Sequence, residues 1–276
     1  MHLRIGYDIV FQLPAPVPVL TALRVHPSVE ANLVRPENPT IEPNLPRSEY
    51  FDVFGNRIGR IHAPAGMLRL TNDAVIHVSG QPDPAEPWAV QHPVTHLPPD
   101  VLTFLLPSRY CEVDRLGDVA WSLFQNTPFG WPRVQAVCNW VHSHVTFGYA
   151  HARASKSAYD VYVEAAGVCR DFTHLAVTFC RCLGIPARYA TGYLGDVGVP
   201  IDPNPMDFSA WFDVYLGGRW HTFDARHNRP RIGRVVMARG RDAVDVALTT
   251  AFGVANLEKF VVWTYEVPEL QNTATD

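Results

Sequence analysis

The 276-residue sequence predicts an α+β fold, with a β-rich N-terminal part ahead of a core of helices and antiparallel strands. Its first hundred residues alternate apolar and polar side chains and contain no convincing helical stripe. Helical spacing begins only after residue 106, and a later apolar segment is interrupted by Gly217-Gly218, typical of a two-residue hairpin turn. We therefore divide the chain into residues 1–106 and 107–276.

The composition indicates a folded globular protein with little charge to attract a polyanion. Hydrophobic residues make up 47% of the chain, and 23 basic residues face 27 acidic ones, for a net charge of −4. Because nucleic-acid binding needs a basic surface, we expect no nucleic-acid partner. No segment approaches the ~20 apolar residues of a membrane span, and no signal-peptide core opens the chain. We expect a cytoplasmic protein without membrane contact.

The N-terminal part is expected to be a sandwich or meander of antiparallel strands. Gly, Pro and Asn separate its alternating segments, as turns require. The segments that resemble half-buried strands are residues 2–12, 56–72 and 73–80.

Three helices and several strands are expected in the second part. Pro132 stands where a helix can begin, Ser157 and Asp160 have capping-box spacing, and Gly167 is expected to end the second helix. The third helix carries a long apolar stripe and must lie in the core. The helices are expected at 131–147, 157–166 and 169–183, and the strands at 187–195, in a hairpin within 207–228, and at 259–267.

Cys169 stands at the first turn of the third helix, on the side of its apolar stripe. Burial as a small hydrophobe is one interpretation of this position. The other is a reactive thiol, because the unpaired amides and the dipole of a helix start stabilise a thiolate and can bind an oxyanion. The cysteines at 138, 180 and 182 lack this setting and are expected to pack in the core.

We expect no metal or cofactor. Cys180 and Cys182 point about 200° apart on a helix, so they cannot share an ion. No acidic loop has the spacing of calcium ligands. The five cysteines are odd in number and unevenly spaced, which indicates reduced thiols rather than a disulfide framework.

The hairpin is expected to place Ser209 and Asp224 together. A turn at 217 and 218 pairs 216 with 219, and the same register puts Ser209 and Asp224 on one face as diagonal neighbours. His221 then faces the other way. For Asp224 alone, an exposed strand-end carboxylate would be the simpler interpretation.

Two segments resemble the transglutaminase-like superfamily: GVCRDFTHLAVTFCRCLGIPARYATGYLG at 167–195 and DFSAWFDVYLGGRWHTFDARHN at 207–228. DVFGN at 52–56 is similar to the β-rich domain that precedes the core in a bacterial group often described as cysteine proteases. The resemblance implies a papain-like core with a Cys, His, Asp triad. It also implies action on peptide or protein amides, by hydrolysis or acyl transfer.

One position departs from this pattern. Cys169 and Asp224 match the nucleophile and the orienting carboxylate, but Ser209 stands where the superfamily carries its histidine. A serine hydroxyl cannot take a proton from a thiol near neutral pH. His174 and His221 point elsewhere, which leaves His227, three residues after Asp224, as the preferred substitute base. Asp207 would be too weak a base unless it is desolvated.

These residues support two main functions. The first is a transglutaminase-like thiol enzyme whose site is Cys169, Asp224, Ser209 and His227. The alternative is a catalytically impaired protein that keeps the groove and binds a peptide or another amide-bearing ligand. A scaffold that recruits partners through an open edge of the N-terminal sheet is a third, weaker interpretation. The substrate and the oligomeric state are left open.

Overall fold

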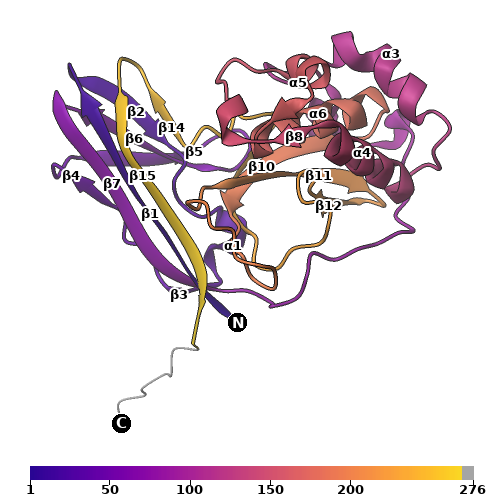
Figure 1. Cartoon of the computed structure of the whole chain (residues 1–276). Helices are drawn as coiled ribbons and strands as arrows, with labels where there is room; N and C mark the ends of the chain where they lie inside the picture. The colour runs from indigo at the N-terminus through magenta and orange to yellow at the C-terminus, as the bar shows by residue number, and fades with distance from the viewer. Residues whose placement is uncertain (269–276) are drawn as a thin grey trace.

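The N-terminal part is a sandwich of two antiparallel sheets, seen edge-on in the computed structural model, which describes residues 1–268 (Figure 1). One sheet has the order β15-β1-β7-β3, with β4 also paired to β7, and the other has the order β14-β2-β6-β5. Their strands are β1 (His2–Leu13), β2 (Val17–Thr21), β3 (Leu33–Arg35), β4 (Thr40–Glu42), β5 (Arg47–Phe51), β6 (Arg57–Ala63), β7 (Gly66–His77), β14 (Thr249–Ala251) and β15 (Asn256–Val267).

The alternation of β1 explains the sandwich. Leu3, Ile5 and Ile9 are almost fully buried between the sheets, where they meet Val19 and Ile61 from the opposite sheet. The expected strand at 56–72 is two strands, because it contains all of β6 and the first residues of β7, with a turn between residues 63 and 66. The expected strand at 73–80 is the rest of β7, which ends at His77. The short strands β2 to β5 were not foreseen, because Pro-rich sequence hides their pattern.

The last strand returns to the N-terminal sheet. We expected 259–267 to lie in the second part, but β15 pairs with β1 along its whole length, from His2 opposite Val267 to Gln12 opposite Asn256. Period-two alternation predicts a strand without saying which sheet it joins. The division of the chain at residue 107 stays a prediction.

The second part is a four-stranded antiparallel sheet, in the order β12-β11-β10-β13, with helices over one face and the sandwich beside the other (Figure 1). The sheet consists of β10 (Ala187–Tyr193), β11 (Ser209–Leu216), β12 (Arg219–Phe223) and β13 (Val235–Gly240). The helices of this part are α3 (Val113–Phe124), α4 (Trp131–His144), α5 (Ala158–Glu164) and α6 (Cys169–Cys182), with a 3₁₀ turn at 149–151. The first 106 residues also contain the short helices α1 (Pro27–Glu30) and α2 (Pro99–Leu102), with 3₁₀ turns at 94–96 and 103–105.

The predicted helices are present with adjusted ends, and α3 was not foreseen. The residues after α4 form β8 (Thr146–Phe147), which pairs in parallel with β9 (Ala166–Gly167). The capping box of Ser157 and Asp160 opens α5 as expected. Ala165, in the left-handed region with φ 52°, ends that helix in place of Gly167.

Helix α6 is the centre of the core. Its residues Phe172, Leu175 and Phe179 are buried against Phe212 and Val214 of β11. This packing fixes the position of α6, whose first residue is Cys169. Within residues 1–268, none of the helices combines the length and the apolar character that crossing a bilayer requires.

Candidate active site

Cys169 is the first residue of α6 and is half-buried. It lines a pocket of about 140 Å³ whose walls come from the end of β10, the loop that leads into β11, and the turn after β12. The polar residues of this pocket are Tyr149, Cys169, Asp196, Asp202, Asn204, Asp207, Ser209, Arg226, His227 and Arg231. The structure thus brings Cys169, Ser209 and His227 to one cavity.

The start of α6 is fixed by Asp171. This fully buried carboxylate accepts a hydrogen bond from the amide of Val168 at 2.9 Å and pairs with Arg170 at 3.2 Å. A side chain at position 167 would place its Cβ 2.5 Å from the Cβ of Asp171, so only glycine fits there. The backbone conformation just before α6 is therefore restricted by the side chain of Asp171.

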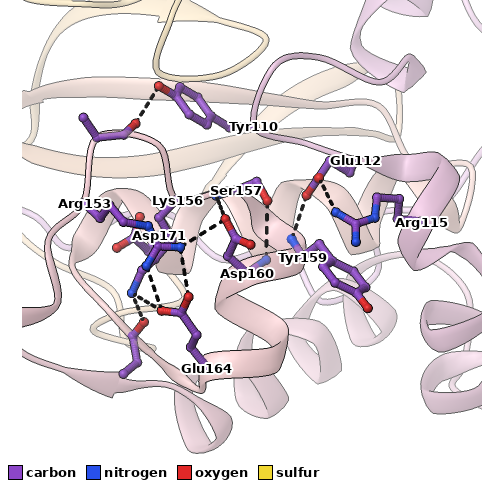
Figure 2. Close-up of polar contacts among 12 residues, drawn as sticks. Tyr110, Glu112, Arg115, Arg153, Lys156, Ser157, Tyr159, Asp160, Glu164 and Asp171 are labelled. Atoms are coloured by element: carbon purple, nitrogen blue, oxygen red, sulfur yellow. Dashed lines mark hydrogen bonds and ion pairs between the residues drawn. The ribbon is translucent and has the colours of Figure 1, made fainter.

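The buried Lys156 binds the segment that precedes α6. Figure 2 shows Arg153 and Lys156 converging on Glu164, below the capping box of α5. The ammonium of Lys156, 2% exposed, lies 2.9 Å from a Glu164 oxygen and donates to the carbonyl of Ala166 at 2.9 Å. The hydrogen bond from Arg153, with help from Lys156, lowers the pKa of Glu164 to about 2. Ala166 is thereby held three residues ahead of the cysteine.

Burial raises the pKa of the Cys169 thiol to about 11, and neither the nearby Arg226 cation nor the main-chain amides of Ala210 and Arg170 offset this effect. This shift favours the neutral thiol and argues against our expectation of a thiolate at the helix start, which stays a prediction. Attack on a substrate requires a base that takes the proton.

His227 is oriented by Asp224. Its Nδ1 lies 2.8 Å from Oδ2 of Asp224, and its amide donates to Oδ1 of the same carboxylate at 2.9 Å. The turn that allows this closes at Asn228, where φ is 50° and the amide donates to the Asp224 carbonyl. Since Nδ1 faces the carboxylate, Nε2 is the ring nitrogen left without a protein hydrogen bond among the described residues.

Asp224 is 6% exposed and has a cationic partner besides the His227 imidazole. Arg234, just before β13, donates to its Oδ2 at 2.8 Å and also bonds Asp83 at 2.8 Å. Burial alone would raise the pKa of Asp224, but the Arg234 cation and the hydrogen bonds of His227 hold it well below its usual range. The carboxylate thus stays ionised behind the imidazole.

Ser209 begins β11 and is 6% exposed. Within residues 1–268 its hydroxyl has no hydrogen-bond partner, while its carbonyl accepts from Thr191. The hairpin register is as predicted, from Leu216 opposite Arg219 to Phe212 opposite Phe223.

Helix α6 packs on the face of Phe212 and Val214, which is the opposite face to the one that the register gives to Ser209. The ladder ends at Phe223, and Asp224 lies just beyond it. The site is assembled at the ends of the strands.

The other candidate bases lie in different settings. His221 contacts the Leu216 carbonyl and packs on Trp131, and His174 accepts from the amide of Ala243 deep in the core. Neither lines the pocket. Asp207 stands at its rim, and desolvation by the surrounding protein raises the pKa of its carboxyl.

Several residues that support the site were missed from the sequence. Arg234 and Asp83 reach it from distant segments, and no spacing in the sequence places them there. Asp171 could have been found, because an acid at the third helical position is a known N-terminal signal. Arg226, which directly precedes His227, was given no role from the sequence.

Comparison with known proteins gives the family. The crystal structure of "a Putative Cysteine Protease from Cytophaga hutchinsonii" has 30% sequence identity and a TM-score of 0.82, and the match covers 96% of this chain and 90% of that one. The chain belongs to the transglutaminase-like superfamily. The model of that superfamily matches residues 122–225, which include Cys169, Ser209 and Asp224 and stop two residues before His227.

Mycobacterial relatives extend the comparison. An uncharacterized protein of Mycobacterium tuberculosis is 27% identical over 244 residues, which is 81% of this chain and 77% of the relative. An uncharacterized protein of Mycobacterium leprae is 29% identical over 119 residues, and this match spans only 42% of the relative and 41% of this chain. The α+β architecture with antiparallel sheets is thus that of a transglutaminase-like protein.

Proposed function

We propose that this transglutaminase-like protein is a thiol enzyme that acts on peptide or side-chain amides, with Cys169 as nucleophile, His227 as base and Asp224 as its orienting carboxylate. The observation that carries the proposal is the 2.8 Å bond between His227 Nδ1 and Asp224 Oδ2, in a turn that borders the pocket of Cys169. In thiol hydrolases the cysteine gives its proton to an imidazole, and a carboxylate orients that imidazole. The usual position of the base is occupied here by the small side chain of Ser209.

In the proposed reaction, His227 Nε2 takes the thiol proton as sulfur attacks the amide carbonyl. The carbon–sulfur bond forms, and the carbon–nitrogen bond breaks when the imidazolium returns the proton to the departing amine. Because burial holds the pKa of Cys169 near 11, proton removal has to accompany the attack. The first-turn amides of α6 supply donors for the oxyanion.

Release of the thioester then decides the product. Water gives hydrolysis, and an amine gives acyl transfer; we favour hydrolysis, as the resemblance to the bacterial cysteine-protease group suggests. The position of His227 serves both outcomes, since the same imidazole would deprotonate either acceptor.

A binding protein without turnover is the second candidate. It is favoured by the protonated thiol and by Ser209 at the usual place of the histidine. Under this view the pocket binds an amide-bearing ligand and the thiol is a packing group.

Digestion of a peptide library, followed by mass spectrometry, separates the two candidates. Backbone cleavage or deamidation of glutamine by the wild-type chain supports the enzyme, provided that Cys169→Ala and His227→Ala abolish it. Addition of methylamine reveals acyl transfer as a mass increase on glutamine. Ser209→Ala is the matched control, because loss of an unbonded hydroxyl removes no proposed catalytic group. An unchanged library, with peptides retained by both wild type and His227→Ala, would instead support the binding protein.

A further inference from the structure

Arg226 is held beside the nucleophile. Its guanidinium carbon lies 3.8 Å from the centre of the Phe147 ring, in a cation–π contact. Phe147 pairs with Gly167 in the small parallel ladder, two residues before Cys169. The main chain of Arg226 is held as well, since its carbonyl accepts from Nδ1 of His142 at 2.8 Å. The guanidinium and the sulfur thus line one pocket.

This guanidinium has no hydrogen-bond partner in the protein. Among the described residues, Arg226 makes no ion pair and donates no side-chain hydrogen bond, which leaves its five N–H donors available to a ligand. The other charges of the pocket are engaged or lie at its rim. Arg231 faces Asp196 at 3.5 Å, Asp202 accepts from Asn204, and Asp207 stands at the rim.

Resting on the proposed function, we infer that Arg226 is a specificity residue that binds a carboxylate lying next to the amide attacked by Cys169. A planar guanidinium with free edges is the group that recognises carboxylates by paired hydrogen bonds. The substrate class is therefore a peptide amide flanked by a carboxylate. That carboxylate can be the C-terminus of the peptide or the side chain of an adjacent acidic residue.

The opposing charge is Asp207. Both residues act on the Cys169 thiol, and the effect of Arg226, which favours the thiolate, is larger than that of Asp207, which disfavours it. The other titratable side chains that line the pocket are Tyr149, Asp196, Asp202, His227 and Arg231. An anionic reagent should therefore be favoured at this sulfur, and removal of Asp207 should favour it further.

Two alkylating reagents of nearly equal shape test this directly. Iodoacetate and iodoacetamide both lose iodide as the sulfur–carbon bond forms, but only the first carries a carboxylate. The ratio of their rates at Cys169, followed by mass spectrometry of the Cys169 peptide and divided by the ratio for glutathione, does not depend on the fraction of thiolate. We expect this ratio to exceed one, and to fall about fivefold in Arg226→Gln, the order expected for one nearby unit charge in a partly screened site.

Three further variants test whether the charge of the pocket causes the preference for iodoacetate. Arg226→Lys keeps the charge and should retain part of the preference, Asp207→Asn should increase it, and Arg229→Gln, which removes an exposed cation outside the pocket, should leave it unchanged. An unchanged ratio in Arg226→Gln overturns the inference and leaves the thiol enzyme intact. A Cys169 that neither reagent modifies overturns both proposals.

The same variant distinguishes the two carboxylate sources. With peptides that the wild type cleaves, a free C-terminus is compared with its amide, and a neighbouring glutamate with glutamine. In one of these two pairs the wild type should prefer the peptide with the carboxylate. Arg226→Gln should remove that preference by raising the KM of the carboxylate peptide. If both pairs react equally in the wild type, the inference is wrong.

Discussion

His227 Nδ1 lies 2.8 Å from Asp224 Oδ2, although only three residues separate the two in the chain. In the motif that the sequence resembles, the imidazole comes from the position of Ser209, at the start of the other hairpin strand. The carboxylate and the cysteine stay where the motif has them. His227 and Asp224 therefore supply the same imidazole and carboxylate, but both come from the end of β12 and the turn that follows it.

Loss of the imidazole should abolish turnover without unfolding the protein. His227→Ala removes the proposed base, and we expect kcat to fall about 10³-fold or more, as when a triad member is lost. His221→Ala, which removes a histidine outside the pocket, should leave kcat within a few fold once the protein is folded. Kinetics on a library-derived peptide, with circular dichroism as the folding control, measures both. Equal losses in the two variants would assign His227 a structural role.

Removal of Arg234 should shift the pH–rate profile. The cation partly neutralises Asp224, so its loss favours the imidazolium form of His227. The acid limb of kcat/KM should move to higher pH in Arg234→Met and return toward its wild-type place in Arg234→Lys. The nearby charges of Arg226, Asp207 and Arg231 are unchanged in both variants.

Arg234→Met should also destabilise the fold, since it removes the cation paired with the buried Asp224, at a cost of about 3 kcal/mol. Urea denaturation measures this cost. A destabilised variant whose acid limb does not move would show that Arg234 supports the fold and not the base.

Alkylation of Cys169 should be slow at neutral pH. Its pKa is raised to about 11, so the neutral thiol dominates below that value and the reactive thiolate increases tenfold per pH unit. The rate with iodoacetamide should still rise above pH 9, where a free cysteine has begun to level off. A plateau below pH 7 would instead show a thiolate–imidazolium pair in the resting protein.

Introducing the missing histidine should not help. Ser209 is buried, so Ser209→His must fit a ring at the edge of a pocket already bordered by His227, and overpacking costs about 1–3 kcal/mol. We expect a lower melting temperature and no gain in kcat. Ser209→Ala should keep kcat within about twofold, because the hydroxyl has no partner within residues 1–268. A large gain in kcat for Ser209→His would show that His227 is not the working base.

Lys156 should matter for both stability and the cysteine segment. Lys156→Met removes the charged donor of the Ala166 carbonyl, which costs about 1.5–3 kcal/mol. Lys259→Met is the matched control, since that lysine is exposed and its partner Asp8 keeps its ion pair with Arg69, so the change should cost less than about 1 kcal/mol. Urea denaturation compares them, and equal effects would contradict the role given to the buried amine.

Local signals in the sequence predicted the helix start, the capping box and the hairpin register. Cys169 opens α6 because Gly167 and the apolar stripe define that boundary, and Gly217-Gly218 fixes the pairing of β11 with β12. These features depend on residues close together in the chain. The choice of His227 belongs to the same class, since a turn of three residues brings it back to Asp224.

Contacts between distant segments were beyond reach. The pairing of β15 with β1 joins distant segments of the chain, and Arg234 bonds Asp83 from the first hundred residues as well as Asp224. The face that α6 covers could not be assigned either, because alternation divides residues between two faces without saying which one is packed. The raised pKa of Cys169 follows from burial, which the helix-start argument did not weigh.

Chemical rescue tests the central claim most directly. Acylation of Cys169 by p-nitrophenyl acetate is followed by release of p-nitrophenolate and by intact mass, in the wild type, in His227→Gly, and in His227→Gly with added imidazole. We predict that His227→Gly acylates Cys169 at least tenfold more slowly and that imidazole restores part of the rate. Acylation of Cys169 at the wild-type rate in His227→Gly without imidazole would contradict the account.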